Sequence, residues 1–278
     1  MKYALKSLLA AALATAALAG QAAVVPIDGS SSVFNGAAPI TFSEVALGST
    51  NPTIGSVTFG SFFAGQSLGS IFTCGGIISN CVLGNPTGGS ALALAPSPIG
   101  LAATTVTDPA NTGSPVLGGS ANFTLGNPIA MLFAQDVSAV SFSAGGFNNL
   151  SNTRVTAFSR TGEILGQLLN PGACPAGSTC PPDPLSPLNF FSFAFGSTDA
   201  NNNPFNQIAG ILISVIGFES QGFAIDNVRT VVTPASSGST SSGTTSSGEP
   251  PGQTPEPTSL ALVGLALLGL GAMRRRKV

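Results

Sequence analysis

A succession of short β-prone runs separated by turn-forming residues sets the strongest limit on what this chain can fold into. Between residues 24 and 234, runs rich in Val, Ile, Thr and Phe alternate with Asn-Pro dipeptides, which mark turns or loops. No stretch of this region has the apolar spacing and the caps of an amphipathic helix. Roughly ten short strands without helical alternation predict an all-β fold, a jelly-roll-like β-sandwich.

Particular runs carry further expectations. The two runs at 154–159 and 164–169 predict a hairpin, and the almost wholly apolar run 208–216 predicts a central strand covered on both faces. Residues 84–119, rich in Gly, Pro, Ala and Thr, are expected to form a long irregular insertion. The other expected strands are 40–47, 53–63, 121–125, 129–134, 137–144, 189–195 and 223–232.

The charge and the aromatic content of this region exclude some functions. It holds three Arg, no Lys and nine acidic residues, so its formal net charge is −6 (3 − 9). We therefore expect no nucleic-acid binding, which needs a basic patch. The chain has no His, the commonest general base and metal ligand, and no Trp. Tyr3 is the only Tyr, so the eighteen Phe suit a core better than a sugar-stacking platform.

The four cysteines form two close pairs. Six residues separate Cys74 from Cys81, and five separate Cys174 from Cys180. Four cysteines allow three pairings, and in an exported chain the local pairing, Cys74 with Cys81 and Cys174 with Cys180, is the one we expect. A zinc site is the alternative, which the absence of His disfavours.

The first 23 residues have the layout of a secretory signal peptide. Lys2 and Lys6 precede an apolar run of Leu and Ala from Leu8 to Leu18, and small residues follow. We expect signal peptidase to cut between Ala19 and Ala23. An uncleaved anchor is the alternative, although the apolar run is short for a membrane span of roughly 20 residues.

The C-terminal part consists of a linker and a second signal. Residues 235–254 are almost only Ser, Gly, Thr and Pro, which predicts a disordered linker. Residues 255–278 contain Pro255, Glu256 and Pro257, an apolar stretch over 260–273, and a basic tail. The tail residues are Arg274, Arg275, Arg276 and Lys277. As a helix the apolar stretch measures roughly 21 Å against a hydrocarbon core of about 30 Å, so it predicts one short transmembrane helix with its basic end in the cytoplasm. An ordinary membrane anchor is the alternative.

In order and spacing, the features of residues 255–278 resemble the PEP-CTERM sorting signal of Gram-negative bacteria. The resemblance implies recognition by an exosortase, a membrane cysteine protease and transpeptidase, in organisms that make extracellular polysaccharide. It implies an exported protein, held briefly at the inner membrane and then placed at the outer envelope or released. It says little about what residues 24–234 do.

A weaker resemblance lies in residues 24–234. Three segments, 137–142, 155–166 and 222–228, occur in an order similar to that in the β-sandwich bodies often attached to PEP-CTERM tails. The most recognisable piece is Phe223-Ala224-Ile225-Asp226-Asn227-Val228. Those bodies resemble carbohydrate-binding jelly rolls, which implies contact with polysaccharide.

Asp226 and Asn227 stand in an otherwise apolar run, where an ionised carboxylate is costly unless it is paired or hydrogen-bonded. One interpretation is a calcium site built from carboxylate, amide and carbonyl oxygens. The interpretation we favour is a structural network, in which Asp226 accepts backbone amides of a neighbouring loop or pairs with an arginine such as Arg154.

These observations favour a non-enzymatic exported protein of the extracellular matrix, without a cofactor and with polysaccharide as a candidate partner. A secreted hydrolase acting on polysaccharide is the competing class, and would draw a carboxylate pair from Glu163, Glu219 and Asp226. A purely structural surface protein without a ligand is the third.

Overall fold

The structure is a computed structural model that describes residues 23–69, 74, 80–108, 113–121, 126–145, 147, 151–170, 191–199, 201–217 and 222–234. The named strands pair only in antiparallel fashion. They form two six-stranded sheets and one small ribbon, and a single 3-10 turn, η1 (Ser32–Phe34), lies between β1 and β2. The all-β prediction is therefore confirmed in the described part of the chain.

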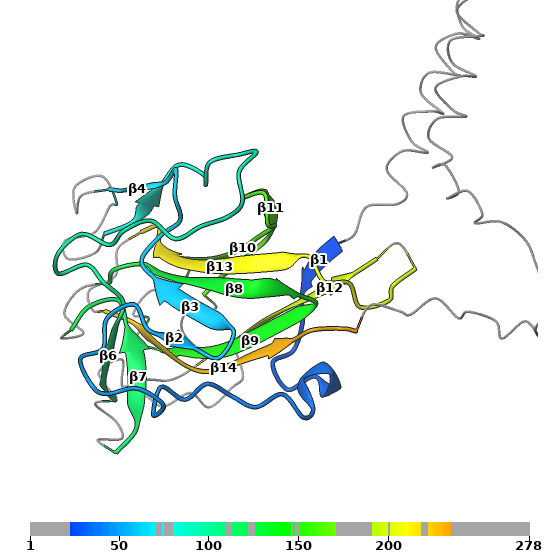
Figure 1. Cartoon of the computed structure of the whole chain (residues 1–278), viewed down its shortest axis with the longest axis horizontal. Helices are drawn as coiled ribbons and strands as arrows, with labels where there is room; N and C mark the ends of the chain where they lie inside the picture. The colour runs from blue at the N-terminus through cyan, green and yellow to red at the C-terminus, as the bar shows by residue number, and fades with distance from the viewer. Residues whose placement is uncertain are drawn as a thin grey trace, which may run out of the picture. The chain divides into compact units, whose positions relative to one another are not determined.

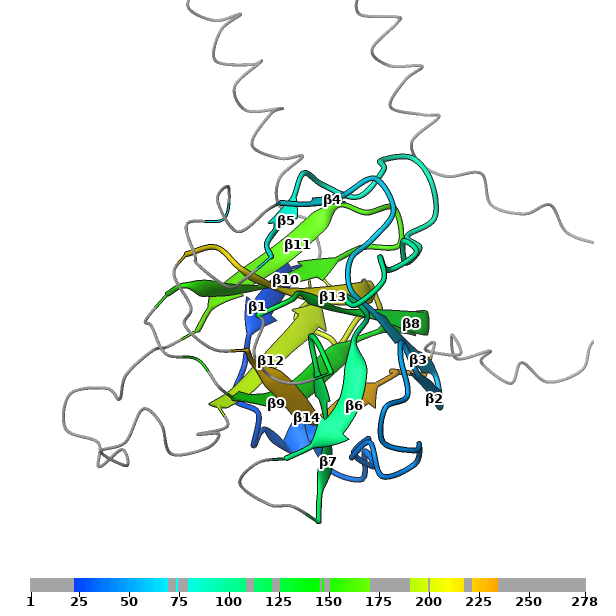
Figure 2. The ribbon, with the colours of Figure 1, turned by 90° about the vertical axis from the view of Figure 1, so that its left-hand side faces the viewer.

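Figure 1 and Figure 2 show the two sheets as the two layers of a sandwich. The first sheet has the order β1 (Ala23–Pro26), β12 (Phe191–Thr198), β9 (Ala139–Gly145), β14 (Ala224–Val231), β7 (Pro115–Gly118) and β6 (Thr104–Thr107). The second has the order β11 (Ile164–Leu169), β10 (Thr153–Phe158), β13 (Ile208–Val215), β8 (Ile129–Val137), β3 (Val57–Gly60) and β2 (Thr53–Ile54). The ribbon pairs β4 (Ser67–Leu68) with β5 (Val82–Leu83).

The last eight strands are nested like the two arms of one long hairpin. β10 pairs with β11, β9 with β12, β8 with β13 and β7 with β14. Consecutive pairs alternate between the two sheets, because β10, β11, β8 and β13 lie in the second sheet and the other four in the first. A folded double arm of eight strands in two sheets is the winding of a jelly roll.

The main hydrophobic core lies between the two sheets. Each sheet turns alternate side chains inward, and the inward set is rich in Phe, Ile and Val, which pack well on a pleated surface. The first sheet contributes Leu117, Val140, Phe142, Phe193, Phe195, Ile225 and Val228, and the second contributes Val57, Phe59, Met131, Phe133, Val155, Ile211 and Ile213. The phenylalanines therefore serve mainly as core, as their number indicated.

The segment between β3 and β6 covers part of the outer face of the second sheet. Phe63 and Leu92 pack there against Phe158 and Leu212 in a second apolar cluster. Gly210 on β13 makes this close approach possible, because an added Cβ would lie 2.7 Å from the Phe63 ring and 2.8 Å from a Leu92 methyl group. All eight residues of β13 are buried, which confirms the prediction of a central strand covered on both faces.

Two expected strands differ from the observed ones. Over 40–47, only Ile40 forms a bridge, with Val228, because Phe42 takes the left-handed conformation (φ 58°) with its side chain fully buried. Over 53–63, a turn at Gly55 (φ 58°) divides one expected strand into β2 and β3. A residue with positive φ therefore interrupts each of these expected strands.

The expected irregular insertion over 84–119 is only partly irregular. Its C-terminal part forms the hairpin of β6 and β7, in which Thr105 pairs with Leu117 and Val106 with Val116. Leu117 enters the main core. The Pro and Gly content masked these strands because Pro115 and Gly118 stand at the two ends of β7, where a strand tolerates them.

Some expectations fall outside the described residues. These are the signal peptide before Ala23, residues 122–125, Cys174, Cys180 and Glu219, and everything after Pro234. The linker, Pro255, Glu256, Pro257, the expected transmembrane helix and the basic tail belong to this last group. Within the part that is described, no helix has the length and apolarity needed to cross a membrane.

Candidate functional site

Asp226 and Asn227 lie in the middle of β14, at a point where its pairing with β9 is irregular. The register with β9 shifts between Asp226 and Arg229, so this stretch of β14 bulges. Asn227 adopts the left-handed conformation (φ 53°), which Asn tolerates better than most residues. Both side chains are half-buried.

The Asp226 carboxylate binds its own neighbour. One oxygen accepts the Asn227 backbone N–H at 2.7 Å, and the other accepts the Asn227 side-chain amide at 3.0 Å. We expected hydrogen bonds from a loop or an ion pair with an arginine. Neither is found for Asp226 among the described residues, and Arg154 lies on β10 of the other sheet.

Burial raises the pKa of Asp226 to about 6, against an ordinary value of 3.8. The Asn227 N–H lowers this pKa, and the negative charges of Asp108 and Glu44 raise it further. Asp108 follows β6 directly, and Glu44 belongs to the 41–48 segment, whose Gly48 N–H donates to Thr105 O at 2.7 Å. The charges of two carboxylates from two other segments therefore act on Asp226.

The arrangement does not by itself define a metal site. Among the residues that the structure describes, no group of three or more His, Cys, Asp and Glu side chains is placed to hold a metal ion. Asn227 and backbone carbonyls supply oxygens that calcium accepts, but both Asp226 oxygens already have hydrogen-bond donors.

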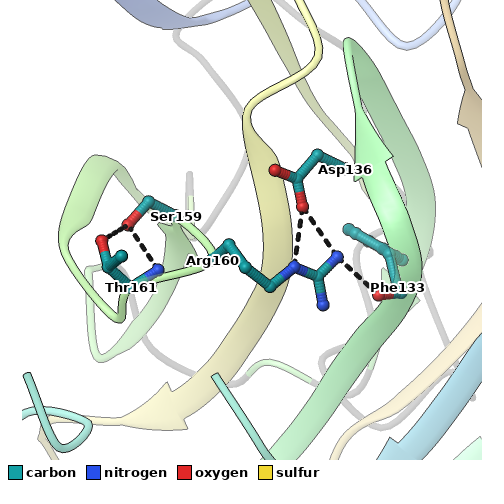
Figure 3. Close-up of polar contacts among 5 residues, drawn as sticks. All are labelled: Phe133, Asp136, Ser159, Arg160 and Thr161. Carbon is teal, nitrogen blue, oxygen red and sulfur yellow. Dashed lines mark hydrogen bonds and ion pairs between the residues drawn. The ribbon is translucent and has the colours of Figure 1, made fainter. Parts of the chain in front are cut away.

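A second polar cluster surrounds Arg160, at the turn between β10 and β11 (Figure 3). Its Nε donates to Asp136 Oδ1 at 2.9 Å, and its Nη2 lies 2.7 Å from the same oxygen. Nη2 also donates to the backbone carbonyl of Phe133 at 2.9 Å. Both charged side chains are about one-third exposed (33% and 32%).

The Arg160 cluster stabilises an irregular part of β8. The register of β8 with β13 passes from Leu132 opposite Gly210 to Val137 opposite Ile208, so four β8 residues face one residue of β13. Such a bulge leaves backbone groups without ladder partners, and the guanidinium of Arg160 supplies the donor for one of them. Sequence reasoning missed this role. The sequence did contain a signal for it: residues 24–234 hold only three Arg among nine acidic residues, so an Arg such as Arg160 is expected to form an ion pair.

The disulfide between Cys74 and Cys81 is present, as expected from their spacing. Both residues are buried, and Cys81 directly precedes β5. The Val82 N–H donates to Ser214 Oγ on β13 at 2.9 Å, which ties this loop to the second sheet. This hydrogen bond therefore holds the residue next to the bridge against the strand that the segment covers.

The two described candidates for the carboxylate pair of a hydrolase, Glu163 and Asp226, belong to different sheets. Glu163 stands in the β10–β11 turn of the second sheet, and its backbone N–H donates to Ser159 Oγ. Asp226 lies on β14 of the first sheet, where its charged neighbours are Asp108 and Glu44. The structure does not bring Glu163 and Asp226 together as the carboxylate pair of a glycosidase.

Comparison with known proteins identifies the C-terminal segment. Residues 253–277 match the family described as the PEP-CTERM protein-sorting motif, and the resemblance inferred from the sequence is thereby confirmed. No curated protein and no solved structure matches the chain.

Proposed function

We propose that this protein is exported, processed by an exosortase at its PEP-CTERM segment, and used as a non-enzymatic component of the extracellular matrix that contacts polysaccharide. The observation that carries the proposal is the sorting motif over residues 253–277 in the same chain as an all-β body. Between them lie residues 235–252, a Ser-, Gly- and Thr-rich stretch that gives a folded domain reach beyond the membrane.

The sorting step can be tested by replacing Pro255, Glu256 and Pro257 together with Ala. The native protein should lose its basic tail, and mass spectrometry of the surface fraction should find a C-terminus before Arg274. The variant should keep the tail and accumulate in the inner-membrane fraction. A variant in which Arg274 to Lys277 are replaced by Ala separates motif recognition from membrane orientation. Processing of the triple variant at the native rate would contradict exosortase sorting.

The support for a binding role comes from the architecture and composition of the body, and not from a defined ligand site. A two-sheet jelly roll has long edges and loops that can carry contacts to an extended polymer, and function often resides in loops on such a scaffold. Few charges and many amide and hydroxyl side chains suit the neutral hydroxyl groups of a sugar. A partner of this kind needs no cofactor, and we propose none.

The polysaccharide arm requires two measurements on the exported protein. One is retention on the organism's own exopolysaccharide, and the other is release of reducing sugar from it. Binding without release supports the proposal. Release that disappears in Glu163→Ala, Glu219→Ala or Asp226→Ala would instead assign a hydrolase. Absence of both would assign a structural surface protein without a ligand.

For Asp226 and Asn227 we propose a structural role in β14. The two hydrogen bonds from Asn227 hold the carboxylate inside its own strand and fix the bulge. Calcium binding is the competing account. It predicts a higher melting temperature in calcium than in EDTA, whereas the structural role predicts no difference.

A further inference from the structure

The body holds its last residues with a side-chain clamp beyond the end of β14. Thr233 lies two residues after that strand, and Asn206 lies in the connection between β12 and β13. The Thr233 N–H donates to Asn206 Oδ1 at 2.9 Å, and Asn206 Nδ2 donates to the Thr233 carbonyl at 2.7 Å. One amide side chain therefore satisfies both backbone groups of Thr233, as a paired strand residue would.

A second attachment runs through Ser138. The Thr233 hydroxyl donates to Ser138 Oγ at 2.7 Å. The Ser138 backbone N–H and its hydroxyl both donate to the Val231 carbonyl, at 2.8 and 3.1 Å. Ser138 is only 2% exposed, so these contacts are largely shielded from water.

Ser138 occupies a special place in the fold. It is the single residue between β8 of the second sheet and β9 of the first, where the chain passes from one layer to the other. Its carbonyl accepts the Ser197 N–H of β12 at 2.8 Å. Ser138 therefore connects the end of the body to strands of both sheets. Figure 1 shows the orange end of β14 beside the connection that follows β12.

We propose that Asn206, Thr233 and Ser138 form a load-bearing anchor for the C-terminal tether. A strand pulled from its end opens one hydrogen bond at a time, because terminal backbone pairs fray first. Here the first bonds to break would be the two between Thr233 and Asn206, and then the three that join Thr233 and Val231 to Ser138. The mechanical role rests on the proposed function, since only a body that stays joined to an anchored C-terminal segment is loaded at Thr233.

Hydrogen exchange on the full-length chain tests the anchor without any reference to function. Asn206→Ala should speed exchange of the Thr233 amide about tenfold or more, since it removes two hydrogen bonds. Asn201→Ala is the matched control, because its backbone N–H binds Asp199 and its side chain is not part of the clamp. Equal exchange of the Thr233 amide in the native chain and in Asn206→Ala would overturn the anchor.

Pulling single molecules tests the mechanical role. One handle is placed on Ile99→Cys, which is fully exposed, and the other on either the C-terminus or the exposed Leu47→Cys. When the load is applied between Ile99 and the C-terminus, Asn206→Ala should raise the rate of the first opening step about tenfold. When it is applied between Ile99 and Leu47, the substitution should leave the opening rate unchanged. An equal change in both geometries would show a general loss of stability, and no change in either would show that the clamp bears no load. Both results overturn the mechanical role, and neither depends on polysaccharide binding.

Discussion

Replacement of Asp226 by Asn should stabilise the body at neutral pH when calcium is absent. The change keeps the size of the side chain and one acceptor oxygen for the Asn227 N–H. It removes a negative charge that is half-buried on β14 and repelled by Asp108 and Glu44. Because desolvation and like charges make the ionised form costly in the folded state, removing that charge removes a cost.

The size and sign of the effect follow from the pKa. The folded pKa is raised from 3.8 to about 6, so between these values the folded state holds a proton that the unfolded state has lost. The stability of the native protein therefore falls as pH rises through this window and levels off above pH 6. At 1.36 kcal/mol per pKa unit, the full loss is about 3 kcal/mol, and solvent screening of this half-buried group reduces it to about 1–2 kcal/mol.

The assay is thermal or urea unfolding of both proteins from pH 3.5 to 8 in EDTA. The stabilities should be similar at pH 3.5, and the free energy of unfolding of the variant should exceed that of the native protein by about 1–2 kcal/mol at pH 8. Asp199→Asn is a control that should lower the stability at pH 8 instead of raising it. The reason is that hydrogen bonds to its carboxylate, above all the one from the Asn203 backbone N–H, lower the pKa of Asp199. An Asp226→Asn variant no more stable than the native protein at pH 8 would refute the reasoning.

Calcium reverses the expectation if a site exists. An ion bound only to the folded state adds about 2.7 kcal/mol at one hundred times its dissociation constant. The native protein at pH 8 should then gain stability in calcium and Asp226→Asn should not. A native melting temperature that is the same in calcium and in EDTA would support the structural role.

Three further changes test the packing and the covalent link. Replacing Cys74 and Cys81 together with Ser should cost about 2–3 kcal/mol, read as a lower urea midpoint than that of the oxidised native protein. Arg160→Gln should cost about 1–2 kcal/mol of stability, and most of this cost should remain in 1 M salt, because salt does not screen the lost hydrogen bond to the Phe133 carbonyl. If the cost vanishes in salt, it comes from the ion pair with Asp136 instead. Gly210→Ala should cost about 1–3 kcal/mol by pushing Phe63 and Leu92 away from β13, whereas Gly88→Ala, where an added Cβ meets nothing within 4 Å, should be nearly neutral.

Strand identity was predictable wherever the pattern of side chains was local. The hairpin at 154–159 and 164–169 appears as β10 and β11, and the alternating Phe193 and Phe195 of β12 enter the core as expected. Two of the failures share a cause, because Phe42 and Gly55 interrupt apparent strands with positive φ. The conformation of Phe42 accompanies the full burial of its side chain, which the local residue pattern does not reveal.

The polar clusters could not be read from the sequence in the same way. Asp226 was singled out because a carboxylate in an apolar run must be accommodated, yet its neighbours Asp108 and Glu44 are distant in sequence. The same holds for Arg160 with Asp136, which meet only because a bulge in β8 leaves Phe133 with a free carbonyl. Contacts between distant residues depend on sheet order and register, and local residue patterns do not determine either.

The nested pairing of the strands also decides when this chain can finish folding. The outermost pair joins Leu117 of β7 to Ile225 of β14, 108 residues further along (225 − 117). Closing so long a loop is slow, and hairpins such as β10–β11 can form much earlier. If the chain is exported N-terminus first, as we propose, β14 is the last of the described strands to leave the membrane, and the sandwich can close only after almost all of the body has been exported. Completion of the fold would then closely precede exposure of the sorting motif, which lies C-terminal to β14, to its processing enzyme.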